Sequence, residues 1–500
     1  MNDMNQPDRN APLDLPPDTF RALGHQLVDD LADFLASLPG RSVTTGETPA
    51  EVRAAVGDLA LPHEGTDPAV LLAEVTRLVI DHSTLNGHPD FLAFITSSAA
   101  PIGALGDLLA STVNPNLGGW PLAPVATEIE RQTVRWIAEF LGYPSPHGLL
   151  VSGGNMANLV AFWAARRAKA PWNIRTSGAA AGPRLMVYVS KETHTWIQKA
   201  ADLSGMGTEA IRWIPTDGRQ RMIPSALDEA ILRDRADGLH PLLVVGTAGT
   251  VSTGAVDPLA EIGALCRRHD LWFHVDGAYG APAAALPEWA DEFRGLAEAD
   301  SIAIDPHKWF YTPLQAGCVL VKDMAHLRDA FSYHPPYYPE KDEAVDAALM
   351  YHEYGPENSR GFRALKVWLG FRQVGRDGFV TMIRDDIAMA RRLFDRVTDH
   401  PEFEGVTQDL SIATFRYVPP DVDASDPATR EYLNTLNARI LDRLQESGTA
   451  YLSNAVIDEV YLLRACVVNF RTSAGRIDVL PEKIAEVGRE VHQGLRHIGH

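Results

Sequence analysis

The chain has 500 residues, 45% apolar and 22% charged, which is typical of a soluble globular protein with two or three domains. Its formal net charge of −20 argues against a general nucleic-acid-binding protein, which would need clustered lysines and arginines. Three scattered cysteines without a CxxC pair, no signal-like start and no membrane-length apolar run predict a cytoplasmic protein without disulfides or membrane segments.

The N-terminal part of the chain is predicted to be helical. After a polar lead-in, apolar residues recur at helical spacing from Phe20 to Leu35, with Asp18 or Thr19 as the helix cap. We next expect a helix that includes residues 70–80, irregular stretches over 86–98 and 112–124, and an amphipathic helix over 125–141. We assign residues 1–105 to an N-terminal helical segment.

From Gly148 onward, short β-rich runs alternate with helical ones. The predicted strands are 149–151, 185–189, 211–214, 242–245, 271–275, 301–304 and 317–321. The predicted helices are 155–168, one opening near His194, one starting at Ser225 with Asp228 in a capping-box-like pattern, and 258–269. This alternation indicates an α/β domain with a mainly parallel sheet flanked by helices, which we place at residues 106–380.

The last part of the chain predicts a loop and a smaller domain. Residues 333–360 show no clear period, which favours a lid over the site. Helices are expected over 362–374, 383–397 and 430–446, and strands over 414–417 and 462–470. We assign residues 381–500 to a small C-terminal α/β domain.

Five chemically informative positions lie just after predicted strands. They are the Gly153-Gly154 turn, His194, Thr247, Asp276 and Lys308. In parallel sheets, ligands bind beyond the carboxyl ends of the strands. We therefore expect these five positions to meet at one edge of the sheet.

The chemistry of these positions is compatible with pyridoxal 5′-phosphate (PLP). A lysine at the end of a buried strand can form a Schiff base with an aldehyde, and a carboxylate such as Asp276 can keep a pyridine nitrogen protonated. Small residues at Gly153-Gly154 let backbone N–H groups approach a phosphate at a helix start. Each position also has a plain structural interpretation: a lysine reaching from a strand end to solvent, an aspartate in a turn, a tight glycine turn and a hydrogen-bonded histidine.

Four longer motifs carry a resemblance. They are Ser152-Gly153-Gly154-Asn155-Met156-Ala157-Asn158-Leu159, His274-Val275-Asp276-Gly277-Ala278-Tyr279-Gly280, Asp305-Pro306-His307-Lys308-Trp309 and Ser359-Arg360-Gly361-Phe362-Arg363-Ala364-Leu365-Lys366-Val367-Trp368. With them, the chain resembles the group II PLP-dependent decarboxylases, which include the aromatic-L-amino-acid decarboxylases and have PLP fold type I. The resemblance extends from about Phe20 to the C-terminus.

The resemblance implies roles for the residues of the cofactor site. Lys308 would carry the covalent link to the cofactor, Asp276 would face the pyridine nitrogen, and His194 and Ala278 would pack on opposite ring faces. Gly154 and Asn155 would hold the phosphate, with His307 and Asp305 nearby and Thr247 beside the 3′-oxygen or the phosphate. Tyr337 would be the lid tyrosine that returns a proton to the substrate, although the adjacent Tyr338 could take this place.

The resemblance also implies a homodimer with active sites at the subunit interface. Phe94, Ile95 and Thr96 would then line the pocket of the partner subunit, and Trp120 and Phe94 would favour an aromatic substrate. Two positions depart from the family: Asn155 stands where Ser or Thr is common, and Ala93 stands where animal aromatic decarboxylases carry an aromatic residue. Both departures weaken the prediction of the substrate.

The resulting hypothesis is an enzyme that decarboxylates an L-amino acid, with an aromatic one favoured, to the amine and CO2. One alternative is an aldehyde synthase, which also deaminates oxidatively and commonly has Phe at the lid position, so Tyr337 favours simple decarboxylation. A decarboxylase of a non-aromatic amino acid and an aminotransferase are further alternatives. A catalytically inactive interaction protein is disfavoured because Lys308, Asp276 and His194 are all present.

Overall fold

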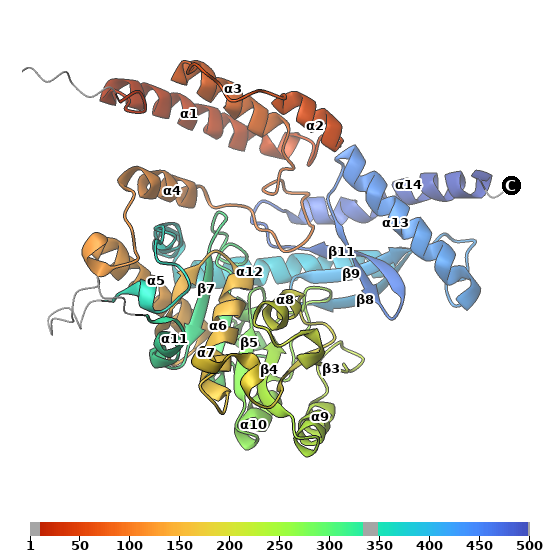
Figure 1. Cartoon of the computed structure of the whole chain (residues 1–500). Helices are drawn as coiled ribbons and strands as arrows, with labels where there is room; N and C mark the ends of the chain where they lie inside the picture. Colours follow the sequence, from red (N-terminus) through yellow and green to blue (C-terminus); the bar gives the residue numbers. More distant parts are fainter. Residues whose placement is uncertain (1–10, 334–348, 499–500) are drawn as a thin grey trace, which may run out of the picture.

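The computed structural model describes residues 11–333 and 349–498. A seven-stranded sheet in the order β1-β7-β6-β5-β4-β2-β3 forms its centre (Figure 1). The strands are β1 (His147–Val151), β2 (Leu185–Ser190), β3 (Ile211–Ile214), β4 (His240–Thr247), β5 (Trp272–Asp276), β6 (Ser301–Ile304) and β7 (Gly317–Val321). β7 is antiparallel to both of its neighbours and the other neighbouring pairs are parallel, so the predicted mainly parallel sheet is confirmed.

Both faces of this sheet are buried, because both sets of alternating side chains are apolar. Val187 and Val189 enter one core, whereas Met186 and Tyr188 enter the other. The first core is closed mainly by α6 (Gly154–Lys169), α8 (Trp196–Leu203) and α11 (Met324–Phe331). The second is closed by α5 (Pro124–Leu141), α9 (Pro224–Ala236), α10 (Leu259–Arg268) and the first part of α12 (Ala364–Asp399). Burial on both faces explains the continuous apolar runs of the sequence.

A long helix, α12 (Ala364–Asp399), connects this layer to a smaller one. The sequence predicted two helices, over 362–374 and 383–397, and the structure has two helical segments that meet at a kink at Gly375, where φ is 70° and ψ is 172°. Glycine tolerates this conformation, and the second segment follows directly after it, earlier than predicted. The predicted domain boundary at residues 380/381 falls inside this helix, and the division into domains stays a prediction.

The smaller layer is an antiparallel sheet in the order β10-β11-β9-β8. Its elements are β8 (Phe403–Asp409), β9 (Ile412–Tyr417), α13 (Arg430–Ser447), β10 (Ser453–Ile457), β11 (Val460–Cys466) and α14 (Ala474–Ile498). The second half of α12 packs with α13 and α14 on this sheet around one apolar core. The strand predicted over 462–470 is β11, which ends at Cys466, four residues earlier than predicted.

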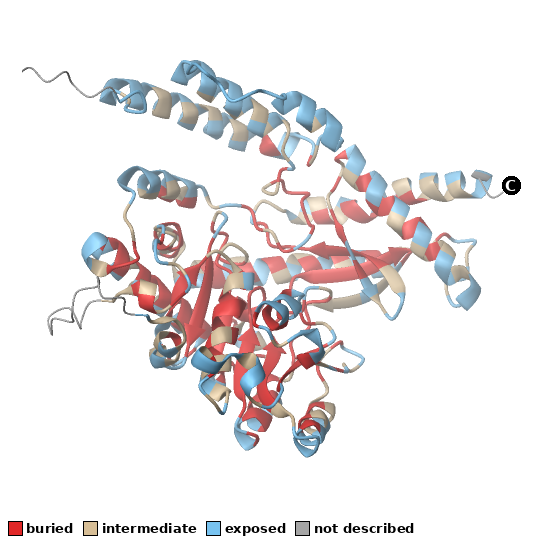
Figure 2. Cartoon of the chain, in the orientation of Figure 1, coloured by how far each residue is buried: buried red, intermediate tan, exposed pale blue. Residues whose placement is uncertain are grey.

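The N-terminal helices lie apart from both sheets in Figure 1. They are α1 (Pro17–Ser37), α2 (Pro49–Val56) and α3 (Pro68–Asp81), and none contains a buried residue (Figure 2). Apolar side chains such as Leu31, Leu35, Val75 and Val79 are exposed on α1 and α3. Among the helices of the described residues, none has the length and apolar character needed to cross a bilayer.

Local structure agrees with the sequence interpretation in part. The helix expected to open near His194 begins at Trp196. The expected Ser225–Asp228 capping box does not form: α9 begins at Pro224, and Asp228 instead accepts hydrogen bonds from Arg268 and His269. Several elements were not predicted: α2, α4 (Pro101–Val113), the four-residue α7 (Ile174–Ser177), α11, β8, β10 and α14.

Candidate active site

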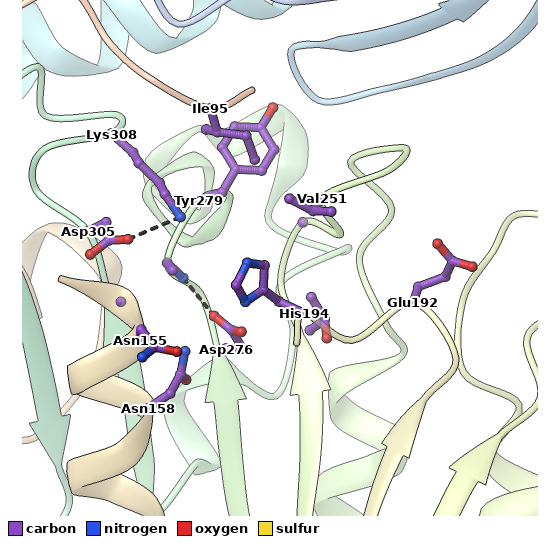
Figure 3. Close-up of a pocket in the computed structure, with 14 residues that line it drawn as sticks. Ile95, Asn155, Asn158, Glu192, His194, Val251, Asp276, Tyr279, Asp305 and Lys308 are labelled. Atoms are coloured by element: carbon purple, nitrogen blue, oxygen red, sulfur yellow. Dashed lines mark hydrogen bonds and ion pairs between the residues drawn. The ribbon is translucent and has the colours of Figure 1, made fainter. Parts of the chain in front are cut away.

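A pocket lies beyond the carboxyl ends of the parallel strands (Figure 3). It is lined by Ile95, Gly154, Asn155, Asn158, Glu192, His194, Thr247, Gly249, Val251, Asp276, Ala278, Tyr279, Asp305 and Lys308. Segments that follow β1, β2, β4, β5 and β6 all contribute to this list. The five predicted positions therefore meet at one edge of the sheet, as the order of strands and turns suggested.

Asp276 ends β5 and is held by two N–H donors. The indole Nε1 of Trp196 donates to its Oδ2 at 2.7 Å, and the backbone N–H of Ala278 donates to its Oδ1 at 3.3 Å. The side chain is buried, at 7% exposure. Two fixed donors hold the carboxylate in one orientation, so that it can face a cationic group in the pocket.

Lys308 lies in the turn after β6, where its Nζ is 3.0 Å from Oδ2 of Asp305. The Lys308 backbone N–H also donates to the Asp305 carbonyl oxygen at 2.8 Å. Nε2 of His307 lies near the same oxygen, at 3.6 Å from Oδ2 of Asp305. Asp305 thus fixes the only lysine in the pocket lining of the described chain.

His307 and His194 are neutral imidazoles at neutral pH. Burial lowers the pKa of each ring, and the nearby Lys308 ammonium lowers both pKa values further against the opposing effect of the carboxylates. The backbone N–H of Ala316 donates to Nδ1 of His307 at 3.2 Å, and that of Trp196 donates to Nδ1 of His194 at 3.3 Å. Each ring therefore carries its proton on Nε2, and His194 can stack on an aromatic ring in the pocket without bringing a charge.

The turn between β1 and α6 requires glycine because other groups approach it closely. A Cβ on Gly154 would lie 2.6 Å from Oδ2 of Asp305 and 3.0 Å from Cβ of Ala278. The glycine thus leaves room for the carboxylate that holds Lys308. No side chain caps the start of α6, and Gly154 and Asn155 line the pocket there, where an anion would be stabilised.

Thr247, the last residue of β4, offers a hydroxyl group to the pocket. Its backbone N–H donates to Oδ2 of the buried Asp257 at 2.8 Å, which fixes the end of the strand. Its Oγ1 is buried without a hydrogen-bond partner among the described residues. A buried hydroxyl that lines a pocket and lacks a partner is a candidate contact for a bound molecule.

Asn158 was not predicted as a site residue, and a chain of hydrogen bonds beneath the pocket orients it. Trp272 Nε1 donates to Oγ of Ser301 at 2.8 Å, and this hydroxyl lies 2.8 Å from Nδ1 of His274. Nε2 of His274 lies 2.6 Å from Oδ1 of Asn158. With the serine donating to Nδ1, the histidine donates to the Asn158 oxygen, and the Asn158 amide nitrogen is left for the pocket.

The buried His274 in this chain of hydrogen bonds should make the stability of the fold depend on pH in the acidic range. Burial lowers the pKa of His274 from 6.5 to about 4, so between these values the unfolded chain binds a proton that the folded chain does not. As pH falls from 6.5 to 4, the folded state should lose about 3 kcal/mol from this group, and the loss should be complete below pH 4. We expect urea unfolding of His274→Gln to depend less on pH in this window than that of the wild type; parallel curves would contradict the assignment.

The predicted substrate residues are only partly brought together. Ile95 lines the pocket of its own chain, because Oγ of Ser97 donates to the His307 carbonyl oxygen at 2.8 Å and anchors this loop beside Lys308. Its expected contact with the pocket of a partner subunit stays a prediction. Phe94 is 56% exposed, and the half-buried Thr96 does not line the pocket.

Trp120 lies outside the pocket. It lines a separate groove with Val125, His147 and Tyr351, and its Nε1 donates to Glu128 at 3.2 Å. The two lid candidates, Tyr337 and Tyr338, fall outside the described residues. Their role therefore stays a prediction from the sequence.

Other pocket residues were missed by sequence reasoning: Asn158, Glu192, Gly249, Val251 and Tyr279. Asn158 could have been found, because it follows Asn155 by three residues and thus shares its helix face. Tyr279 belongs to a motif that was recognised, but its own role was not considered. Glu192 and Val251 lie in loops, whose course the sequence pattern does not specify.

Comparison with known proteins gives consistent results. A family model described as the pyridoxal-dependent decarboxylase conserved domain matches residues 49–418. An aromatic-L-amino-acid decarboxylase of Bacillus atrophaeus is 34% identical over 481 residues, covering 96% of this chain and 97% of the relative. The crystal structure of Oryza sativa TDC with PLP and tryptamine has a TM-score of 0.89 at 29% identity, covering 96% and 99% of the two chains. That of Rhodiola rosea 4-hydroxyphenylacetaldehyde synthase has a TM-score of 0.84 at 28% identity, covering 96% and 99%.

Proposed function

The chain belongs to the pyridoxal-dependent decarboxylase family, and we propose that it converts an aromatic L-amino acid to the corresponding amine and CO2. It is a PLP-dependent amino acid decarboxylase with the fold of that family. The observation that carries the residue assignments is the convergence of Lys308, Asp276 and His194 on one pocket at the strand ends.

The residues of the pocket fit PLP. The hydroxyl of Thr247 and Oδ1 of Asp305 are buried and have no hydrogen-bond partner within residues 11–333 and 349–498, so a polar bound molecule would satisfy them. Gly154 and Asn155 line the pocket at the amino end of α6, which no side chain caps, so N–H groups there can hold a phosphate. We infer that Gly154, Asn155, Thr247, Ala278, Asp305 and His307 line the bound cofactor.

When bound, PLP supplies an electron sink for the electron pair left by the departing CO2. In our proposal, Nζ of Lys308 would hold the cofactor aldehyde, and Asp305 would orient that nitrogen. Asp276 would hold the proton on the pyridine nitrogen, and Trp196 keeps its carboxylate aligned. His194 would pack on the ring as a neutral imidazole, which avoids repulsion with a cationic ring.

The lining of the pocket supports an uncharged substrate side chain. Within the described residues, Lys308 is the sole cation of the lining, and it is already committed to the cofactor in this proposal. An acidic substrate side chain would meet Glu192 and find no arginine there. Ile95, Val251 and Tyr279 offer apolar and aromatic surface instead. The named activity of the Bacillus relative supports the same choice.

We further propose that the working form is a cytoplasmic homodimer. The apolar side chains exposed on α1 and α3 form a surface that a second copy of the chain could cover. The three cysteines are free and buried, which fits a reducing compartment. Light scattering of the purified protein measures the mass directly, and a monomer with full activity would contradict the dimer.

The substrate proposal is tested with the twenty amino acids and the PLP-loaded protein. CO2, amine, aldehyde and peroxide are quantified for each amino acid. We expect CO2 and an equal amount of amine from tryptophan, tyrosine or phenylalanine. Preferred turnover of glutamate would overturn the aromatic assignment, and stoichiometric aldehyde with peroxide would identify an aldehyde synthase.

Tyr337 is predicted to separate these two outcomes. If it returns a proton to the substrate α-carbon, Tyr337→Phe should keep cofactor binding but divert product from amine toward aldehyde. The amine-to-aldehyde ratio is measured by chromatography, with Tyr338→Phe as the matched control. If Tyr338→Phe diverts the product instead, the role belongs to the neighbouring tyrosine; no diversion by either variant would contradict a tyrosine at this step.

A further inference from the structure

Trp309 and Tyr311, which closely follow Lys308 in the chain, both donate hydrogen bonds to the carboxylate of Asp386. Nε1 of Trp309 donates to Oδ2 of Asp386 at 2.9 Å, and the hydroxyl of Tyr311 donates to the same atom at 2.6 Å. Both aromatic side chains are essentially inaccessible to solvent. Asp386 lies in the second half of α12, on the helix segment that packs against the smaller sheet.

A second anchor holds Tyr279, which lines the pocket. The ring of Tyr279 stacks on Trp309 with centroids 4.8 Å apart and planes inclined by 23°. Its hydroxyl lies 2.6 Å from Oγ of Ser411 and accepts the Ser411 backbone N–H at 3.0 Å. Ser411 is located between β8 and β9 of the smaller sheet. We call Tyr279, Trp309 and Tyr311 with their two anchors, Asp386 and Ser411, the aromatic brace.

The backbone at Tyr311 supports a positional role for this brace. Tyr311 has φ of 50°, a left-handed conformation that is unusual for a bulky residue. Such strain persists where surrounding contacts define the conformation. The contacts here are the bond to Asp386, the Tyr311 N–H donated to the Lys308 carbonyl oxygen at 3.1 Å, and the Ala100 N–H donated to the Tyr311 carbonyl oxygen at 2.8 Å.

Asp386 is a costly residue for packing alone. It is only 3% exposed, and no lysine or arginine within the described ranges forms an ion pair with it. An apolar residue would fill this position on the helix at a lower desolvation cost. A carboxylate, by contrast, can accept two hydrogen bonds at one oxygen and thereby orient two rings at once.

We propose that Asp386 is a positioning residue, which fixes the Lys308 turn through Trp309 and Tyr311 and, together with Ser411, ties the pocket to the smaller domain. This inference rests on the proposed function, because it assigns Lys308 as the reacting lysine. Of the brace, only Tyr279 lines the pocket; Asp386, Trp309 and Tyr311 lie outside its lining and act through the Lys308 turn. The brace would keep Nζ of Lys308 within reach of the cofactor aldehyde.

Tyr311→Phe tests the proposal with the smallest change, because it removes one hydroxyl and keeps the ring. Tyr143→Phe is the matched control: Tyr143 is equally buried in the same apolar core and donates to the Ala299 carbonyl oxygen at 2.8 Å. Both PLP-loaded variants are compared for kcat, KM, thermal midpoint and the pH dependence of the visible band of the lysine-bound cofactor. We expect Tyr311→Phe to lower kcat about 10-fold at nearly constant KM and to shift the pH profile of the band. Tyr143→Phe should lower only the midpoint.

Equal kcat and equal band profiles in the two variants would overturn the proposal, since a merely structural hydroxyl would produce that result. Asp386→Asn gives a second measurement, because the amide keeps an oxygen acceptor of the same shape. Its kcat should exceed that of Asp386→Ala, and an Asp386→Ala protein with wild-type kcat would also overturn the proposal. If Asp386→Ala does not fold, the Tyr311 pair decides. If the wild type binds PLP but releases no CO2 from any amino acid, the proposed function fails, and the band profile still tests the brace.

Discussion

Lys308→Ala is expected to lack both turnover and the visible absorbance of the lysine-bound cofactor. Lys308 alone among the pocket-lining residues of the described chain carries an amine, so no other side chain there can replace its bond to the aldehyde. We expect the rate of CO2 release to fall by about 10³-fold or more. The measurements are CO2 release at saturating substrate and an absorbance spectrum after incubation with PLP.

Lys366→Ala is the matched control for this experiment. Lys366 is a buried lysine whose Nζ contacts Oδ2 of Asp107 at 3.0 Å, the same separation as between Lys308 and Asp305. Its loss should lower thermal stability because it leaves a carboxylate unpaired, but the absorbance band should remain. Turnover by Lys308→Ala near the wild-type rate, or loss of the band in both variants, would contradict the assignment of Lys308.

The location of the site could be predicted because the relevant signals are local. Apolar runs mark strands, and the residues that follow each run can be read from the sequence, so Asp276 and Lys308 could be placed at or just after strand ends without knowledge of the fold. The parallel arrangement then brings these ends to one edge. His194 and Thr247 were found in the same way, and all four line the pocket.

The features that the sequence did not predict depend on contacts between distant segments. Asp386 stands beside Asp385 in an amphipathic helix, a pattern typical of a solvated face, and only the fold brings it to Trp309. Helix α4 was missed because Gly103 and Gly106 weaken its helical pattern. The reason for Gly106 is tertiary: a Cβ there would lie 2.9 Å from Leu369 of α12. The own-chain position of Ile95 likewise depends on the bond between Ser97 and the Lys308 turn.

The negative charge of the Asp276 carboxylate is expected to affect kcat more than the size and shape of the side chain do. Asp276→Asn keeps the size of the side chain, and its amide oxygen can still accept the Trp196 N–H that now bonds Oδ2 at 2.7 Å. PLP should therefore still bind to Lys308 and produce the visible band. A neutral amide, however, cannot hold a proton on the pyridine nitrogen, so the ring withdraws electrons less strongly from the bond to the carboxyl group. We expect kcat to fall by about 100-fold or more, with a smaller change in cofactor affinity.

Asp234→Asn separates this effect from the general cost of removing a buried charge. Asp234 is 3% exposed and accepts hydrogen bonds from Tyr188 and Arg212, outside the pocket lining. Its amide variant should lose stability because a guanidinium remains without its counter-charge, whereas kcat of the folded fraction should stay near that of the wild type. If Asp276→Asn also retained kcat within about 10-fold, the carboxylate would act only by holding Trp196 and the turn at Ala278, and the electron-sink role inferred for Asp276 would be wrong.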